Sequence, residues 1–94
     1  MAVTVAFHGF PEVRRAAGTT AFRLEPDPPT LGALLEALRE RGVPVGERLL
    51  SPEGHIQDTV QVIRNGEEWL ARDRPDTPLR PGDEITFLFM MAGG

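Results

Sequence analysis

The chain contains no cysteine and no lysine among its 94 residues. Without cysteine it can form no disulfide, no thiolate nucleophile and no cysteine-ligated zinc or iron–sulfur site. All ten basic residues are arginine, so Schiff-base chemistry and the lysine of nucleotide-binding phosphate loops are excluded as well. Any reactive group of this chain must therefore be of another kind.

An excess of positive charge is also absent, because the ten arginines are outnumbered by 14 acidic residues and the net charge is −4. Nucleic-acid backbones and anionic membranes both require a basic surface, so we expect no nucleic-acid partner and no membrane partner. No apolar run approaches the roughly 18–20 residues that span a bilayer. No basic leader precedes the first apolar segment, and we expect a cytoplasmic protein.

The length of 94 residues is that of one small domain, and no linker-like segment interrupts it. We therefore expect a single domain over residues 1–94. A chain with one modest core has little room for a deep catalytic site, so a carrier, adaptor or subunit is a better hypothesis than a complete enzyme. His8 and His55 are far apart in sequence and lack acidic residues at ligand spacing, so we expect no metal site.

Alternating apolar and polar residues predict a strand over residues 2–8 and a second strand over residues 20–25, paired with the first as a hairpin. The glycine- and proline-containing residues 9–18 between them are interpreted as a turn-rich connection. Thr30 is a good N-cap for a helix that we predict over residues 30–41. Its apolar stripe has the spacing of one buried helical face and consists of Leu31, Leu34, Leu35 and Leu38.

The second half of the chain contains a strong hairpin signal, Asn65-Gly66, after a strand predicted over residues 60–63. The return strand is predicted over residues 67–70, with Trp69 as a packing residue. The sequence does not decide the structure of residues 43–58.

The last predicted strand covers residues 84–90 and follows Pro81-Gly82, which suits a type II turn. Both faces of its second half are apolar, as in a central strand. Asp83 and Glu84 are better explained by this turn and strand start than by paired acid–base catalysis. The complete order predicts an α+β domain in which a mixed sheet of four to five strands packs on one main helix.

The segment Ala92-Gly93-Gly94 follows this apolar strand almost directly. Two residues without a Cβ atom can pass through a narrow channel in a partner, and the α-carboxylate of Gly94 is unhindered. A carboxylate must be activated before it can be attacked, for example as an acyl-adenylate. The chain has no nucleotide-binding glycine motif, so a partner would have to perform this step. A featureless, frayed terminus is the alternative.

Several segments together resemble the ubiquitin-like sulfur-carrier family, which includes the small subunit of molybdopterin synthase (MoaD) and the thiamine sulfur carrier (ThiS). The resemblance extends over nearly the whole chain in the same order, and it implies a β-grasp fold. The matching segments are the leucine-rich helix after Thr30, VIRNG at residues 62–66, TPLRPGDEI at residues 77–85, and AGG at residues 92–94.

The resemblance implies that the Gly94 carboxylate is adenylated by a ubiquitin-activating-like adenylyltransferase and converted to a thiocarboxylate by a sulfurtransferase. Gly93 would be the slender segment that leads to it. The chain itself would bind no cofactor, because ATP and the sulfur donor are used by the partner enzymes. On this interpretation the chain is a cosubstrate with no catalytic site of its own.

The resemblance also places a partner-contact surface around the end of the last strand. We expect Phe87 to be buried and Phe89, Met90 and Met91 to be partly exposed on this surface. Family members commonly have a Pro-Pro or Pro-Ala pair where this chain has Met90-Met91, and methionine suits a different or less selective groove. The complete set of expected contact residues is Phe87, Phe89, Met90, Met91 and Ala92.

The most specific function implied is that of the small subunit of molybdopterin synthase, with the large subunit as the sulfur-accepting partner. A sulfur carrier for cysteine, thiamine or tRNA thiolation is an alternative within the same class. A ubiquitin-like protein modifier or a plain interaction domain is the alternative from another class. Because it lacks lysine, this chain cannot build lysine-linked chains on itself.

Overall fold

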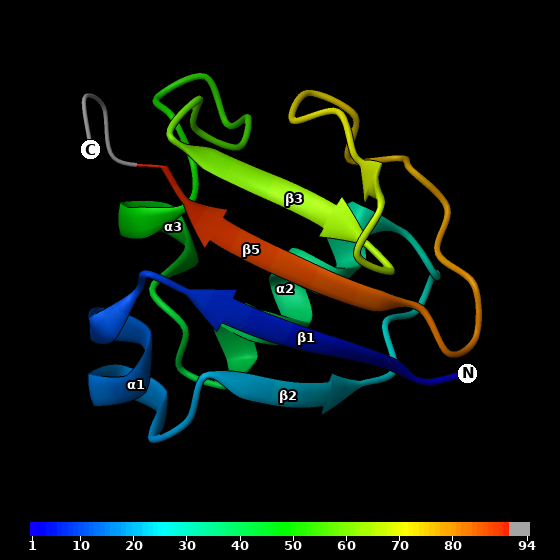
Figure 1. Ribbon diagram of the computed structural model, residues 1–94, viewed down its shortest axis with the longest axis horizontal. Helices are drawn as coiled ribbons and strands as arrows, with labels where there is room; N and C mark the ends of the chain where they lie inside the picture. Colours follow the sequence, from blue (N-terminus) through cyan, green and yellow to red (C-terminus); the bar gives the residue numbers. More distant parts are fainter. Residues whose placement is uncertain (91–94) are drawn as a thin grey trace.

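The structure is a computed structural model that describes residues 1–90. It contains five strands that form one sheet, one long helix behind the sheet and two short helices (Figure 1). The elements are β1 (Val3–His8), α1 (Pro11–Ala17), β2 (Ala21–Leu24), α2 (Leu31–Glu40), α3 (Val45–Arg48), β3 (Val60–Arg64), β4 (Glu68–Trp69) and β5 (Glu84–Phe89).

The strand order is β2-β1-β5-β3-β4, so β5 is the central strand. It runs parallel to β1 and antiparallel to β3, while β1 and β2 are antiparallel. The sheet is therefore mixed, and α2 covers one face of it (Figure 1). These features confirm the predicted α+β class, the central position of the last strand and the β-grasp arrangement.

Helix α2 begins and ends close to the predicted residues. The Thr30 hydroxyl oxygen accepts a hydrogen bond from the Ala33 amide at 3.2 Å, as an N-cap should. Gly42 has a φ of 93°, the left-handed conformation expected after the helix. The predicted apolar stripe is buried against the sheet and consists of Leu31, Leu34, Leu35 and Leu38.

The predicted turns are also present. Asn65 and Gly66 have φ angles of 53° and 74°, so both central residues of the β3–β4 hairpin are left-handed, as a type I′ turn requires. Gly82 has a φ of 84° at the turn that precedes β5. Local turn chemistry therefore predicted where the chain reverses direction.

The interpretation of residues 9–18 as a turn-rich connection was wrong, because this segment contains α1. Pro11 occupies the first turn of the helix, where its missing N–H costs nothing. Val13 is fully buried in the core, and Gly18 ends the helix at a φ of 82°. Packing of one apolar residue against the core therefore favours a helix too short to be recognised by its periodicity.

The prediction that Trp69 is a packing residue was also wrong. Strand β4 has only two residues at the edge of the sheet, and 62% of the Trp69 surface is exposed. Its neighbour Leu70 is buried instead, and the Leu70 amide donates to the Val62 carbonyl at 2.8 Å. Residues 43–58, whose structure the sequence left open, contain the short helix α3, and Leu49, which directly follows this helix, is fully buried.

Candidate functional site

The backbone that leads to the C-terminus is held by the sheet as far as Met90. Val60 opposes Phe89 in the antiparallel β3–β5 ladder. One residue further, the Met90 amide donates to the Thr59 carbonyl at 2.6 Å. The position of the backbone at Met90, the last described residue, is therefore set by backbone hydrogen bonds, and we call this end of β5 the exit point.

The five phenylalanines of the chain form one connected aromatic cluster beneath this exit point. Phe87 stacks on Phe7 with ring centroids 5.0 Å apart, and Phe89 meets Phe10 edge-on at 5.8 Å. Phe87 is fully buried, which agrees with the burial expected from alternation and removes its side chain from the expected contact surface. The Phe87 ring supports β5 from within the core. Phe89, in contrast, is only partly buried.

Gly9 lies against the same exit point at the end of β1. Its φ is 85°, and a Cβ atom on Gly9 would come within 3.1 Å of the Phe89 Cβ. A side chain here would be strained by the positive φ, and its Cβ would require the Phe89 side chain to shift by a few tenths of an ångström. Gly9 therefore allows the last residue of β5 to pack closely on the start of the α1 segment.

On the face of the sheet turned away from α2, apolar side chains remain accessible. Met90 is 43% exposed, and Leu88 is half-buried. Ile63 lies between the buried residues Val62 and Arg64 and therefore points to this face, and Trp69, which pairs with Ile63, points the same way. We call Ile63, Trp69, Leu88 and Met90 the open-face patch, and an accessible apolar patch on a small domain is typical of a binding surface. The sequence analysis did not assign Trp69 to a contact surface, because it predicted that the Trp69 side chain is packed rather than exposed.

Met91, Ala92, Gly93 and Gly94 lie outside the described residues. The expected adenylation and sulfur transfer at Gly94, the role of Gly93 and the contacts of Met91 and Ala92 therefore stay predictions. The described part of the site is its base, formed by Phe89, Met90 and the residues that hold them.

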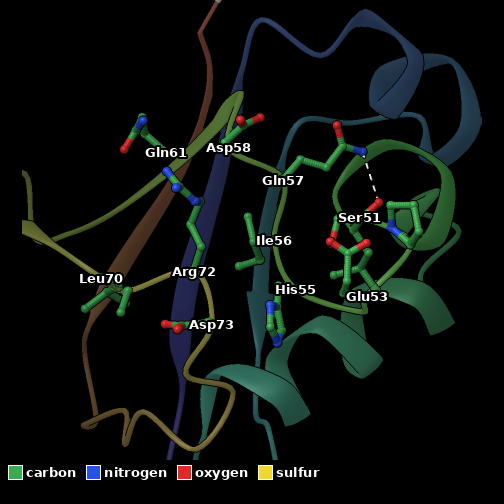
Figure 2. A pocket seen from close by; sticks show the side chains of 13 residues that line it. Ser51, Glu53, His55, Ile56, Gln57, Asp58, Gln61, Leu70, Arg72 and Asp73 are labelled. Carbon is green, nitrogen blue, oxygen red and sulfur yellow. Dashed lines mark hydrogen bonds between the residues drawn. The ribbon is translucent and has the colours of Figure 1, made fainter.

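A groove of about 920 Å³ lies beside this base, between residues 50–58, β3 and residues 70–73. Figure 2 shows Ile56 at the centre of its lining, with Arg72 and Asp73 on one side and Glu53 on the other. No pattern in the sequence predicted this groove, because its walls come from segments that are separate along the chain.

His8 and His55 are both exposed, on β1 and on the groove wall respectively. Within residues 1–90, no group of three or more His, Cys, Asp or Glu side chains is arranged to hold a metal ion. No helix in the same range has the length and apolar character needed to cross a bilayer.

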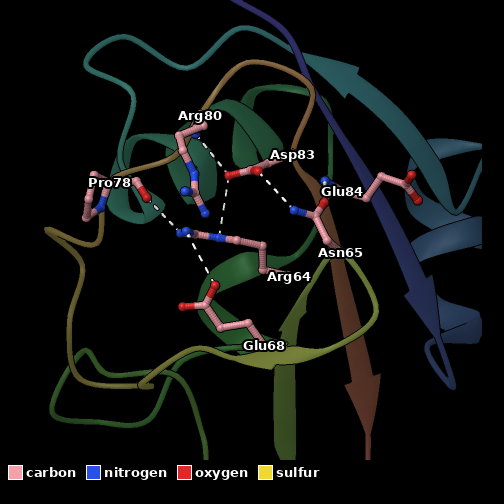
Figure 3. A network of polar contacts seen from close by, with 7 residues as sticks. All are labelled: Arg64, Asn65, Glu68, Pro78, Arg80, Asp83 and Glu84. Atoms are coloured by element: carbon pink, nitrogen blue, oxygen red, sulfur yellow. Dashed lines mark hydrogen bonds and ion pairs between the residues drawn. The ribbon is translucent and has the colours of Figure 1, made fainter.

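A buried polar network lies at the opposite end of β5 (Figure 3). The Arg64 guanidinium and the Asp83 carboxylate form an ion pair with an Nε–Oδ2 distance of 3.4 Å. The Arg80 amide donates to Asp83 Oδ2 at 2.9 Å, and the Asn65 side-chain amide donates to Oδ1 at 3.2 Å. Arg64 also donates to the Pro78 carbonyl at 2.7 Å.

Opposing effects act on the Asp83 carboxylate. Burial by itself raises the pKa of Asp83, but the Arg80 amide, the Asn65 amide and the Arg64 and Arg80 guanidinium groups together hold that pKa below its ordinary value of 3.8. Asp83 therefore stays charged and bound to structural partners, which supports the interpretation of Asp83 as a turn residue rather than as an acid–base catalyst.

The model of the ThiS family matches residues 10–94. The chain belongs to the ThiS family. It is a ubiquitin-like sulfur-carrier protein with a β-grasp fold, as the resemblance implied. A comparison with curated proteins gives no match.

Solved structures match this ThiS-family chain over almost its whole length. SAMP1 of Haloferax volcanii, a small archaeal modifier protein, is 24% identical, with 100% of both chains covered and a TM-score of 0.77. A chain of the BexX/CysO complex of Amycolatopsis orientalis is 22% identical over 98% of this chain and 99% of that chain, with a TM-score of 0.74. A protein assigned as molybdopterin converting factor, subunit 1, in Pyrococcus furiosus is 19% identical, with coverage of 97% and 99% and a TM-score of 0.68.

Proposed function

We propose that this ThiS-family chain carries sulfur as a thiocarboxylate on Gly94 and serves as the small subunit of molybdopterin synthase. The observation that carries the proposal is the family match, which includes the Gly-Gly segment at residues 93–94. The sheet supports it, because backbone pairing holds the chain up to Met90, directly before the residues that a partner would receive under this proposal.

In the proposed first step, the Gly94 carboxylate attacks the α-phosphate of ATP in the active site of a partner adenylyltransferase, and pyrophosphate leaves. A sulfurtransferase then supplies sulfur at the oxidation level of hydrosulfide, and AMP leaves as the carbon–sulfur bond forms. The chain contributes the carboxylate and the binding surface, and it binds neither ATP nor the sulfur donor by itself. No lysine of its own is present to attack the activated carbonyl.

The proposed partner contact combines the residues beyond Met90 with the open-face patch. Burying Trp69, Ile63 and Leu88 against an enzyme would remove apolar surface from water. A partner chain on a protein of this fold has a precedent in the BexX/CysO complex. Phe87 would not contact the partner and would contribute only by supporting β5 from the core, because its ring is buried.

The test is to incubate the purified chain with the adenylyltransferase from the same genome, ATP and a sulfur donor, and to measure intact mass. We expect an adenylate and then the mass increase of an oxygen-to-sulfur exchange, located at Gly94 by fragmentation. A variant that lacks Gly93 and Gly94 should show neither, while Glu40→Gln on the exposed surface of α2 should react as the wild type does. Failure of the wild-type chain to form either product would refute sulfur carriage.

The acceptor is tested by adding candidate enzymes to the thiocarboxylated chain. We expect the large subunit of molybdopterin synthase to form a complex and to regenerate the carboxylate in the presence of its pterin precursor. Transfer to a cysteine-forming enzyme, a thiazole-forming enzyme or a tRNA-thiolating enzyme instead would leave the carrier function standing and contradict the molybdopterin assignment.

Protein modification is the second candidate, favoured by the match to SAMP1, a protein that its name describes as a modifier. It requires an isopeptide bond between Gly94 and a lysine of another protein. Incubation with the adenylyltransferase, ATP and lysine-containing cell extract would then give adducts that vanish when Gly93 and Gly94 are deleted. If the chain is only a sulfur carrier, no such adduct forms.

A further inference from the structure

The groove beside the base of the C-terminal segment has an apolar floor and a charged rim. Ile56 and Leu70 are buried and form the floor, whereas the Glu53, Asp58 and Asp73 side chains are exposed. The walls are held by backbone contacts, because the Ile56 amide donates to the Arg72 carbonyl at 3.2 Å. The groove is therefore a formed feature of the fold rather than a gap between unconnected loops (Figure 2).

The rim carries an uncompensated negative charge. Its three carboxylates are accompanied by one guanidinium, that of Arg72. Among the described residues, no ion pair involves Glu53, Asp58, Asp73 or Arg72. The net charge of the whole chain is also negative, at −4. A complementary occupant should therefore be cationic.

The groove adjoins the end of β5 at Met90, directly before the segment that a partner enzyme would receive. Asp58 directly precedes Thr59, whose carbonyl accepts the Met90 amide at 2.6 Å. Gln61, which also lines the groove, is paired with Leu88 of β5. An enzyme that encloses the residues after Met90 would consequently lie against the groove at the same time.

We propose that this groove receives an arginine or lysine side chain of the enzyme that activates the C-terminus. The apolar floor matches the aliphatic stem of such a side chain, and the carboxylates match its charged head. The groove thus selects a basic partner surface, in addition to the contacts of the Gly-Gly segment and the open-face patch. This inference rests on the proposed function, because it assigns a second contact to the same activating enzyme.

The test uses the full chain and the adenylyltransferase from the same genome. Asp58→Asn and Asp73→Asn are combined, because these changes remove charge and preserve shape. The matched control combines Glu36→Gln and Glu40→Gln, which remove the same charge from the exposed surface of α2. For each protein we would measure Kd by calorimetry without ATP, and KM and kcat for adenylation, at low and at high salt.

The groove variant should bind about three- to tenfold more weakly, as expected for two exposed charge pairs, with KM raised by the same factor and kcat unchanged. The difference from wild type should shrink at high salt, because screening weakens exposed pairs. The Kd and KM of the control variant should remain close to the wild-type values. Equal Kd values for groove variant and control would overturn the proposal, since the effect would then come from net charge alone.

The two proposals fail in different ways. If the wild-type chain binds the enzyme but is never adenylated, the proposed function fails and the Kd values still decide the groove contact. If adenylation occurs with unchanged Kd and KM in the groove variant, the groove contact fails alone. Absence of any binding by the wild-type chain refutes both.

A second measurement locates the contact directly. The chain has no cysteine, so Glu53→Cys introduces a single thiol on the rim that can carry a photoreactive crosslinker. The crosslink should form on an enzyme peptide that contains arginine or lysine, and a matched Glu40→Cys variant should not label that peptide. Equal labelling from both positions would contradict the proposed contact.

Discussion

The guanidinium of Arg64 and the carboxylate of Asp83 face each other at 3.4 Å with only 7% and 6% of their side-chain surfaces exposed. They connect the end of β3 to the turn that precedes β5, 19 positions later in the sequence. The side-chain oxygen Oδ1 of Asn65 also accepts a hydrogen bond from the Glu84 amide at 2.8 Å at the same point. This network therefore helps to set where the central strand starts relative to β3.

Replacing Asp83 by alanine should destabilise the domain by about 3–5 kcal/mol, because it leaves the Arg64 guanidinium buried without its carboxylate. The measurement is the free energy of unfolding from urea denaturation. Glu68→Gln is the matched control, since Glu68 also contacts Arg64, at 3.7 Å, but is 56% exposed. That change should cost less than about 1 kcal/mol. Similar losses for the two variants would show that burial does not decide the strength of these pairs.

The same carboxylate should make stability depend on acid pH. The pKa of Asp83 in the folded state lies below its ordinary value of 3.8, so its contribution is complete above that value. It is lost as pH falls through the lower folded-state pKa, because only the charged form is stabilised by its partners. Urea unfolding across acid pH should show the difference between wild type and Asp83→Asn narrowing in this range. A difference that stays constant as pH falls would contradict the assignment.

Gly9→Ala should destabilise the domain more than Gly18→Ala. Both positions are left-handed, with φ angles of 85° and 82°, so each substitution carries a backbone cost of about 1–2 kcal/mol. Only at Gly9 would the new Cβ also meet the Phe89 Cβ, at 3.1 Å, whereas nothing lies within 4 Å at Gly18. Thermal or urea unfolding of the two variants measures the difference, and equal losses would exclude a tight contact at the base of the C-terminal segment.

Phe87→Ala and Trp69→Ala should separate the core from the open-face patch. Loss of the buried Phe87 ring should cost about 3–5 kcal/mol, because it leaves a cavity beside Phe7. Trp69 is 62% exposed at the sheet edge, so its removal should change stability by less than about 0.5 kcal/mol. Urea unfolding measures both values, and a large loss at Trp69 would mean that its ring is packed in solution.

Much of the architecture could be predicted because its signals are local. The leucine spacing and the Thr30 cap predict α2, and the left-handed pair Asn65-Gly66 predicts the β3–β4 turn. Helix α1 escaped prediction because seven residues are too few for a periodic pattern, and its formation depends on burying Val13. Trp69 was misplaced because residue type alone does not distinguish the core face of a sheet from its open face.

The features of the candidate site also separate into those that the sequence determines and those that only the tertiary structure decides. The sequence by itself determined the family, the central strand and the Gly-Gly segment, because these depend on residue order and on short-range chemistry. Only the tertiary structure decided that Phe87 lies beneath the surface, that Arg64 pairs with Asp83, and that acidic residues surround a groove beside Met90. Each of these facts depends on side chains that are distant along the chain and become neighbours only when the sheet forms and the core excludes water.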